Sequence, residues 1–155
     1  MRNGAAFCLM FLLLPGVAFG QASPALQLTT RNALTNVDGR MDHMGVDLAG
    51  QRLFATAFDN HTLQVIDLQA GRQISAIANL DEPQAAYYDP ATKHLFVASG
   101  GDGTVKIFDG GTLRLLQTVK LTADVDNARY DARGKHVIVG YGGEKSLYHR
   151  QNALV

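Results

Sequence analysis

The sequence has one cysteine, Cys8, and no tryptophan. A single cysteine forms no disulfide within the chain, and no pair of cysteines or His-x-x-x-His spacing is present to hold a structural or catalytic zinc ion. The Gly-x-Ser-x-Gly elbow of serine hydrolases and the glycine-rich phosphate loops that precede a helix are missing as well. We therefore assign no catalytic residues, no metal ligands and no cofactor from motifs.

Charge of either sign is also scarce and nearly balanced, with 14 Lys and Arg against 14 Asp and Glu. No block of basic residues stands out along the chain. Proteins that follow a phosphate backbone need such a block, so nucleic acid is not an expected partner.

The first twenty residues differ from the rest of the chain. Arg2 precedes an apolar stretch from Ala5 to Ala18 that is too short to span a bilayer. Ala18 and Gly20 then supply small side chains where signal peptidase requires them, which predicts cleavage after Gly20, with Ala22 as the second choice. We expect an exported protein, periplasmic or secreted, with no membrane span after cleavage; the alternative is an uncleaved membrane anchor.

An internal repeat runs through the remaining chain. The segment beginning at Leu53 recurs at Leu95 and again at Val137, a shift of 42 residues each time without insertion. Aspartates keep the same register: Asp47 falls on Asp89 and Asp131. A period of this length is typical of solenoids and propellers.

Within each repeat the pattern predicts short β-strands rather than helices. Three runs in the first repeat, 53–58, 62–68 and 73–77, contain β-branched or aromatic residues and are separated by turn residues, and a further strand at 44–47 precedes them. Four short antiparallel strands per repeat predict an all-β fold of β-propeller blades. The expected divisions are a signal peptide at 1–20, an N-terminal segment at 21–39 with a leading outer strand at 27–36, blades at 40–81 and 82–123, and a partial blade at 124–147.

The segments "RLFATAFDNHTLQVIDLQAGRQISAI" and "HLFVASGGDGTVKIFDGGTLRLLQTV" resemble the YVTN-type repeats of exported bacterial β-propellers. The resemblance covers residues 40–147 and implies a seven-bladed parent propeller, of which this chain carries about two and a half blades. It implies little about function, because such propellers serve as binding scaffolds and, in related superfamilies, as lactonases or redox enzymes. The WD repeat is a lesser match, since the chain has no tryptophan.

The repeat breaks near the end of the chain. His149 stands where the earlier repeats have Val65 and Ile107, and Arg150 stands where they have Ile66 and Phe108. We interpret residues 148–155 as an out-of-register tail, from a shifted or shortened reading frame or from an unusual natural terminus. A chain ending in a partial blade is expected to be poorly stable alone, because repeat arrays need about three units and suitable ends.

The candidate binding residues are polar residues that differ from one repeat to the next. In a propeller the first strand of each blade lines the central channel, so the segments that lead into these strands converge on its mouth. The repeated aspartates, by contrast, are read as turn residues that bond nearby backbone. The candidates are Arg40, Asp42, His43, Glu82, Gln84, Asp124, Asp126, Asn127 and Arg129.

Two functions remain open at this stage. The first is a non-enzymatic exported module that binds a protein or a small polar ligand. The second is a lactonase-like hydrolase or redox enzyme in which Asp42 and His43 act as an acid/base pair or bind a metal beside Glu82 and Asp126. The absence of an accompanying nucleophile or cofactor motif favours the first.

Overall fold

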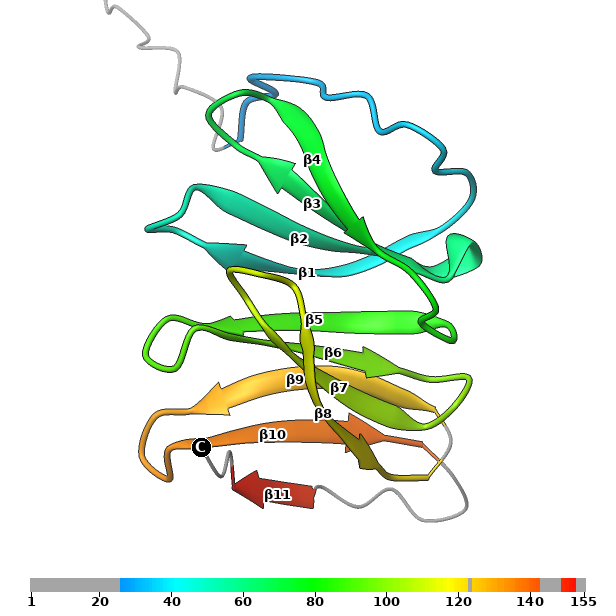
Figure 1. The fold of residues 1–155 in the computed structure, drawn as a ribbon, viewed down its shortest axis with the longest axis vertical. Coiled ribbons are helices and arrows are strands. Elements are labelled where there is room, and N and C mark those ends of the chain that lie inside the picture. Colours follow the sequence, from blue (N-terminus) through cyan, green and yellow to red (C-terminus); the bar gives the residue numbers. More distant parts are fainter. Residues whose placement is uncertain (1–25, 123, 143–148, 153–155) are drawn as a thin grey trace, which may run out of the picture.

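The computed structural model describes residues 26–122, 124–142 and 149–152, and the strands in these ranges form three antiparallel sheets stacked one on another (Figure 1). The first sheet has the order β1-β2-β3-β4, the second β5-β6-β7-β8, and the third β9-β10-β11. Their bounds are Met41–Asp47, Arg52–Ala57, Thr62–Asp67 and Arg72–Ile77 for β1 to β4, Pro83–Asp89, His94–Ser99, Thr104–Asp109 and Leu115–Lys120 for β5 to β8, and Val125–Asp131, His136–Tyr141 and His149–Asn152 for β9 to β11.

The all-β prediction and the four-stranded antiparallel blade are confirmed. The only helical element in the described ranges is a 3-10 turn at Phe58–Asn60. The first two sheets fall inside the expected repeats 40–81 and 82–123, and the third combines β9 and β10 of the expected partial blade with β11, which lies in the segment 148–155 beyond it. The sheets are successive blades of a β-propeller. No helix in the described ranges is long and apolar enough to cross a membrane.

Apolar side chains on alternating sides of each central strand hold the sheets together, as the two-residue period of a strand requires. On β6, Leu95 and Val97 belong to a buried cluster with Phe54 and Leu63 of the first sheet. Phe96 and Ala98, between them in sequence, belong to a second buried cluster shared with the third sheet. The strands β5 and β6 of the second sheet are therefore buried on both faces, which explains why β6 reads as an almost continuous apolar run.

Turns follow the same 42-residue period as the strands. Gln51, Lys93 and Lys135 all adopt a left-handed backbone, with φ of 51°, 59° and 53°. Asp47, Asp89 and Asp131 accept hydrogen bonds from the backbone amides of Gly50, Ala91 and Arg133, and Asp67 and Asp109 do the same after the third strands. These carboxylates close turns, as the sequence analysis predicted.

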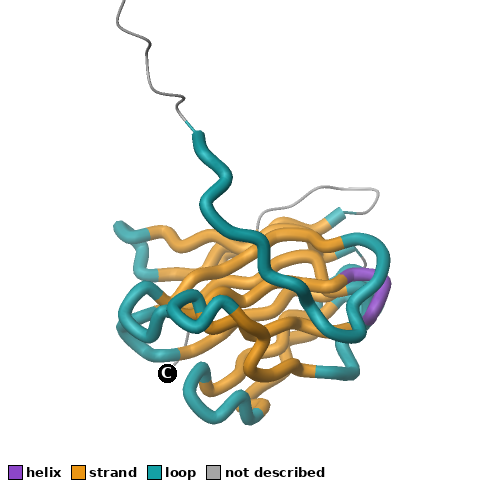
Figure 2. The backbone as a smooth tube through the Cα atoms, turned by 90° about the horizontal axis from the view of Figure 1, so that it is seen from above, coloured by secondary structure: helices purple, strands orange, loops and turns teal. Residues whose placement is uncertain are grey.

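The expected leading strand at 27–36 is not formed. Residues 26–40 have no strand and run as an extended segment past the first sheet (Figure 2). The segment is held through side-chain acceptors: Thr35 donates its backbone amide to Gln73 Oε1 at 3.0 Å, and Asp38 donates to Asn60 Oδ1 at 3.1 Å. Because these acceptors are side chains and not a row of carbonyls, no β-ladder results.

Pairing of the last strand differs from that of its counterparts. In the first two sheets Val65 pairs with Phe54 and Ile107 with Phe96. In the third sheet the strand β11 pairs His149 with Val139 and Arg150 with Ile138. The pairing is therefore shifted by one residue at the point where the sequence departs from the repeat.

Candidate functional site

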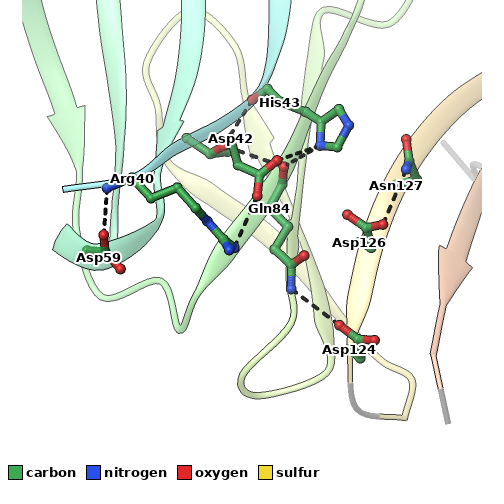
Figure 3. A network of polar contacts seen from close by, with 9 residues as sticks. Arg40, Asp42, His43, Asp59, Gln84, Asp124, Asp126 and Asn127 are labelled. Atoms are coloured by element: carbon green, nitrogen blue, oxygen red, sulfur yellow. Dashed lines mark hydrogen bonds and ion pairs between the residues drawn. The ribbon is translucent and has the colours of Figure 1, made fainter.

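The candidate residues lie where the first strand of each sheet begins. The strands β1, β5 and β9 lie next to one another in the stack and begin at the same end, so residues 40–43, 82–84 and 124–127 approach each other (Figure 3). At this end the loop between the second and third strand of each sheet is tied to the residue that leads into the first strand. Phe58, Gly100 and Gly142 donate their amides to the carbonyls of Arg40, Glu82 and Asp124 at 2.9, 2.9 and 2.8 Å.

A left-handed backbone at two of these positions sets the direction of the entering chain. Glu82 has φ of 49° and Asp124 has φ of 57°. Left-handed backbone is uncommon for residues other than glycine, and Asp tolerates it better than most. The sharp turns at Glu82 and Asp124, directly before β5 and β9, place the following polar side chains at this end of the stack.

Asp42 orients His43. The distance from His43 Nδ1 to Asp42 Oδ1 is 2.8 Å, and the distance from the same nitrogen to the carbonyl oxygen of Gln84 is 3.1 Å. Both neighbours are acceptors, so Nδ1 carries the proton and donates to them. In the neutral imidazole Nε2 then has the free lone pair, and the side chain is 39% exposed.

Arg40 fixes Asp42 in turn. Its Nη2 lies 3.2 Å from Asp42 Oδ2, and its guanidinium carbon lies 3.6 Å from the centre of the Phe58 ring, a cation-π contact. The Arg40 amide also donates to Asp59 Oδ2 at 2.5 Å. Asp42 thus has both oxygens occupied, one by a cation and one by the imidazole.

Buried Thr56 links the first two sheets beneath these groups. Its hydroxyl donates to the carbonyl of His43 at 2.9 Å and lies 3.5 Å from the carbonyl of Gln84. The same position in the second sheet is Ala98 and in the third sheet Gly140. A polar residue at an otherwise small apolar position was the signal that could have identified Thr56 from the sequence; Phe58 gave no comparable signal.

Gln84 and Asp124 extend the contacts to the third sheet. Gln84 Nε2 lies 3.5 Å from Asp124 Oδ1, and Asp124 donates its amide to the carbonyl of Gly100 at 2.9 Å. Asp126 and Asn127 bond each other on β9, at 3.4 Å between Oδ2 and Nδ2 (Figure 3). We call the group formed by Arg40, Asp42, His43, Gln84 and Asp124 the rim network.

Besides Asp126 and Asn127, two predicted residues lie outside the rim network, Glu82 and Arg129. Glu82 contributes backbone contacts: its carbonyl accepts from Gly100, and its amide lies 3.4 Å from His61 Nδ1. Arg129 lies in the middle of β9, opposite Ile138, and its guanidinium bonds the carbonyl of Ala128 at 2.9 Å. Among the described residues no three His, Cys, Asp or Glu side chains are grouped as metal ligands.

Comparisons with known proteins support the fold alone. No protein-family model matches the chain, and no curated protein matches it. A solved structure of hydrazine synthase from Kuenenia stuttgartiensis is similar, with a TM-score of 0.66 and 17% sequence identity. The match covers 73% of this chain and 34% of that one, so the chain spans about a third of the neighbour's length.

Proposed function

We propose that this protein is an exported β-propeller module, built from YVTN-type repeats, that binds a polar ligand at the end of the stack where β1, β5 and β9 begin. The observation that carries the proposal is the rim network, which connects residues from three sheets at one end of the stack. Its parts depart from the repeat, whereas the turn aspartates follow it. Residues that recur in every blade are accounted for by the structure of the blade. Polar residues that occur only at this end of the stack are not, and ligand binding accounts for them.

The charge of the rim favours a ligand that is cationic or donates hydrogen bonds. Asp42 is compensated by Arg40, whereas Asp124 is exposed and, within the part of the chain that the structure describes, its carboxylate contacts the neutral Gln84 amide. Glu82 and Asp126 add negative charge at the same end. His43 Nε2, with its lone pair free, would accept one further hydrogen bond. A basic peptide segment or a small amine fits this surface.

The test uses an arginine-rich peptide as the cationic probe and an acidic peptide of equal length as its counterpart. We expect amide chemical-shift changes confined to residues 40–43, 82–84 and 124–127, and weaker binding at higher ionic strength. Asp124→Asn should weaken binding by up to about fivefold, the effect of one exposed charge pair.

Asp67→Asn is the matched control. It removes the same charge at the opposite end of the first sheet and keeps an oxygen to accept from Ala70, as Asp67 does now. Equal losses in the two variants, or shifts spread over all sheets, would mean that the probe responds to overall charge, and the rim would not be the site.

Hydrolysis is the second candidate, favoured by one specific contact. Because Asp42 holds the Nδ1 proton of His43, Nε2 is placed to take a proton from water or an alcohol. A panel of lactones and esters, assayed with the wild-type protein and with His43→Gln, decides this. Turnover by the wild-type protein that His43→Gln abolishes without unfolding the protein would favour the hydrolase. A wild-type rate equal to the rate in buffer without protein would rule out hydrolysis of those substrates.

A further inference from the structure

The first and second sheets meet around a cation that belongs to the chain itself. The guanidinium carbon of Arg52 lies 5.2 Å from the centre of the Phe54 ring and 5.8 Å from the centre of the Tyr88 ring. These two rings are stacked, with centres 5.6 Å apart. The faces of aromatic rings attract cations, so this junction between the sheets is a cation-π site that an arginine already fills. We call it the first seam.

The second and third sheets meet at the equivalent positions 42 residues later, which we call the second seam. Phe96 and Tyr130 take the places of the two rings there, but His94 takes the place of Arg52. The His94 ring contacts the Phe96 ring edge-on, with centres 6.4 Å apart. Tyr130 is 43% exposed, whereas its counterpart in the first seam is 8% exposed. The second seam therefore keeps the ring pair without the arginine, and one of its rings is open to solvent.

A third ring enlarges the aromatic surface of the second seam. Tyr87 stands where the first seam has Gly45. Its ring lies 6.0 Å from the Tyr130 ring, with 7° between the ring planes, and 6.0 Å from the Phe96 ring. The exposed Tyr130 ring is therefore packed against a second tyrosine, and its free face is formed before any ligand arrives.

The charge beside these rings is negative. Asp89 is 8% exposed, and its carboxylate accepts hydrogen bonds from the Ala91 amide and from the amide and hydroxyl of Thr92, all of them neutral donors. Burial and the negative charge of Asp89 raise the pKa of Tyr87 to about 12. A cation on these rings would be attracted both by the ring faces and by this carboxylate.

The acceptors in each seam indicate the kind of cation. In the first seam Arg52 donates to Asp47 Oδ2 and to the carbonyl of Gly110. In the second seam Asp89 is buried, and both of its oxygens already accept hydrogen bonds from the turn that follows β5. A guanidinium or a primary ammonium would leave N–H donors without this partner, which is costly. A quaternary ammonium has no donors to satisfy, and aromatic faces are its usual binding surface.

We propose that the second seam binds a quaternary ammonium group, of the trimethylammonium kind found in choline, on the exposed face of Tyr130 beside Tyr87. The first seam supports this proposal, because it shows a cation of the chain on the equivalent ring pair. The site lies near the ends of β5 and β9, away from the rim network at their beginnings. It does not rest on the ligand proposed for the rim.

NMR titration with choline chloride tests the proposal, with sodium chloride at equal ionic strength as the reference. We expect saturable shifts of the ring signals of Tyr87, Phe96 and Tyr130. Neohexyl alcohol, in which carbon replaces the choline nitrogen, has the same shape without the charge and should bind about fivefold more weakly, the effect of one cation-π contact. The arginine-rich peptide that probes the rim should leave these rings unshifted.

Tyr130→Phe and Tyr130→Leu form a matched pair. The first keeps the ring and should bind choline like the wild type, whereas the second keeps apolar bulk without the ring and should bind it about fivefold more weakly. Because Tyr130 is exposed, both variants should fold, which their amide spectra check. If Tyr130→Leu does not fold, Tyr130→Val replaces it, since the first sheet has Val46 at this position.

Vesicles of phosphatidylcholine and of phosphatidylglycerol distinguish two sources of the group. Cosedimentation with phosphatidylcholine alone would identify a lipid head group as the ligand, and choline binding without cosedimentation would identify a soluble one. Equal affinity for choline and neohexyl alcohol, unchanged choline binding in folded Tyr130→Leu, or no saturable shift at the three rings would overturn the proposal.

Discussion

Arg52 bridges the first two sheets through Asp47 and Gly110. Replacing it should lower the free energy of unfolding more than replacing an exposed arginine does. Its Nη2 lies 2.7 Å from Asp47 Oδ2, and its Nη1 donates to the carbonyl of Gly110 at 2.6 Å. The Asp47 side chain is 5% exposed and that of Arg52 is 19% exposed. The guanidinium also lies 5.2 Å from the centre of the Phe54 ring. One side chain therefore satisfies a buried carboxylate in the first sheet and a buried carbonyl in the second.

The change Arg52→Met keeps the apolar stem and removes the donors. A buried carbonyl left without a donor costs about 1–3 kcal/mol, and a lost hydrogen bond to a charged group costs about 1.5–3 kcal/mol. Asp47 keeps the Gly50 amide at 2.9 Å, so the two losses are not fully additive. We expect the free energy of unfolding to fall by about 2–4 kcal/mol at neutral pH.

The loss should depend on pH with a definite sign. Burial acts to raise the pKa of Asp47, but the Gly50 amide and the Arg52 guanidinium outweigh it and hold that pKa below its usual 3.8. A carboxyl whose pKa is lower in the folded state stabilises the fold above its unfolded pKa, and this stabilisation is lost as the pH falls through the folded pKa. The difference between wild type and Arg52→Met should therefore shrink below about pH 4.

Urea unfolding followed by circular dichroism and tyrosine fluorescence measures these differences, since the chain has no tryptophan. Arg72→Met is the matched control: Arg72 opens β4 as Arg52 opens β2, but it is exposed, so its loss should change stability by no more than about 0.5 kcal/mol. A cycle with Asp47→Asn should give a coupling of about 1–3 kcal/mol. If Arg52→Met lowers the free energy of unfolding by less than about 1 kcal/mol, or by the same amount at neutral and acid pH, Arg52 does not stabilise the contact between the first two sheets as proposed.

Three further outcomes are expected. N-terminal sequencing of the exported protein should begin at Gln21, and recovery of intact Met1 in a membrane fraction would contradict export with cleavage. Gly45→Val should destabilise the protein strongly in urea, because the added Cβ would lie 2.9 Å from a backbone oxygen, whereas Gly111→Ala, whose Cβ would meet only a side-chain oxygen at 3.4 Å, should be close to neutral. Phe96→Ala removes a ring from the seam between the second and third sheets and should cost about 3–5 kcal/mol; a cost near that of an exposed residue would argue against this seam.

The fold could be predicted from the sequence because the repeat fixes both strands and turns. Residues 42 positions apart occupy equivalent structural positions, so the apolar runs of β2, β6 and β10 and the turn aspartates give the same signal two or three times. The segment 26–40 occurs once and was predicted wrongly at 27–36, since a short run with β propensity does not reveal whether a ladder partner is present.

The site was predicted less completely, because polar character alone does not say where a side chain points. Arg129 was grouped with the rim residues, but it lies further along β9, opposite Ile138. Thr56 was missed since it lies on a second strand, away from the entering segments, and matters only because the first two sheets bring the carbonyls of His43 and Gln84 to its hydroxyl. Contacts between sheets of this kind are set by packing and are not visible in the spacing of residues.

The protonation of His43 tests the central claim, that Asp42 and Gln84 hold this imidazole with Nε2 free to meet a ligand. Nitrogen chemical shifts of the ring, measured by NMR at a pH where the imidazole is neutral, report which nitrogen carries the proton. The geometry predicts a proton on Nδ1 in the wild-type protein, 2.8 Å from Asp42 Oδ1, and a weaker preference in Asp42→Ala. A proton on Nε2, or the same mixture of the two forms in both proteins, would contradict the proposed site.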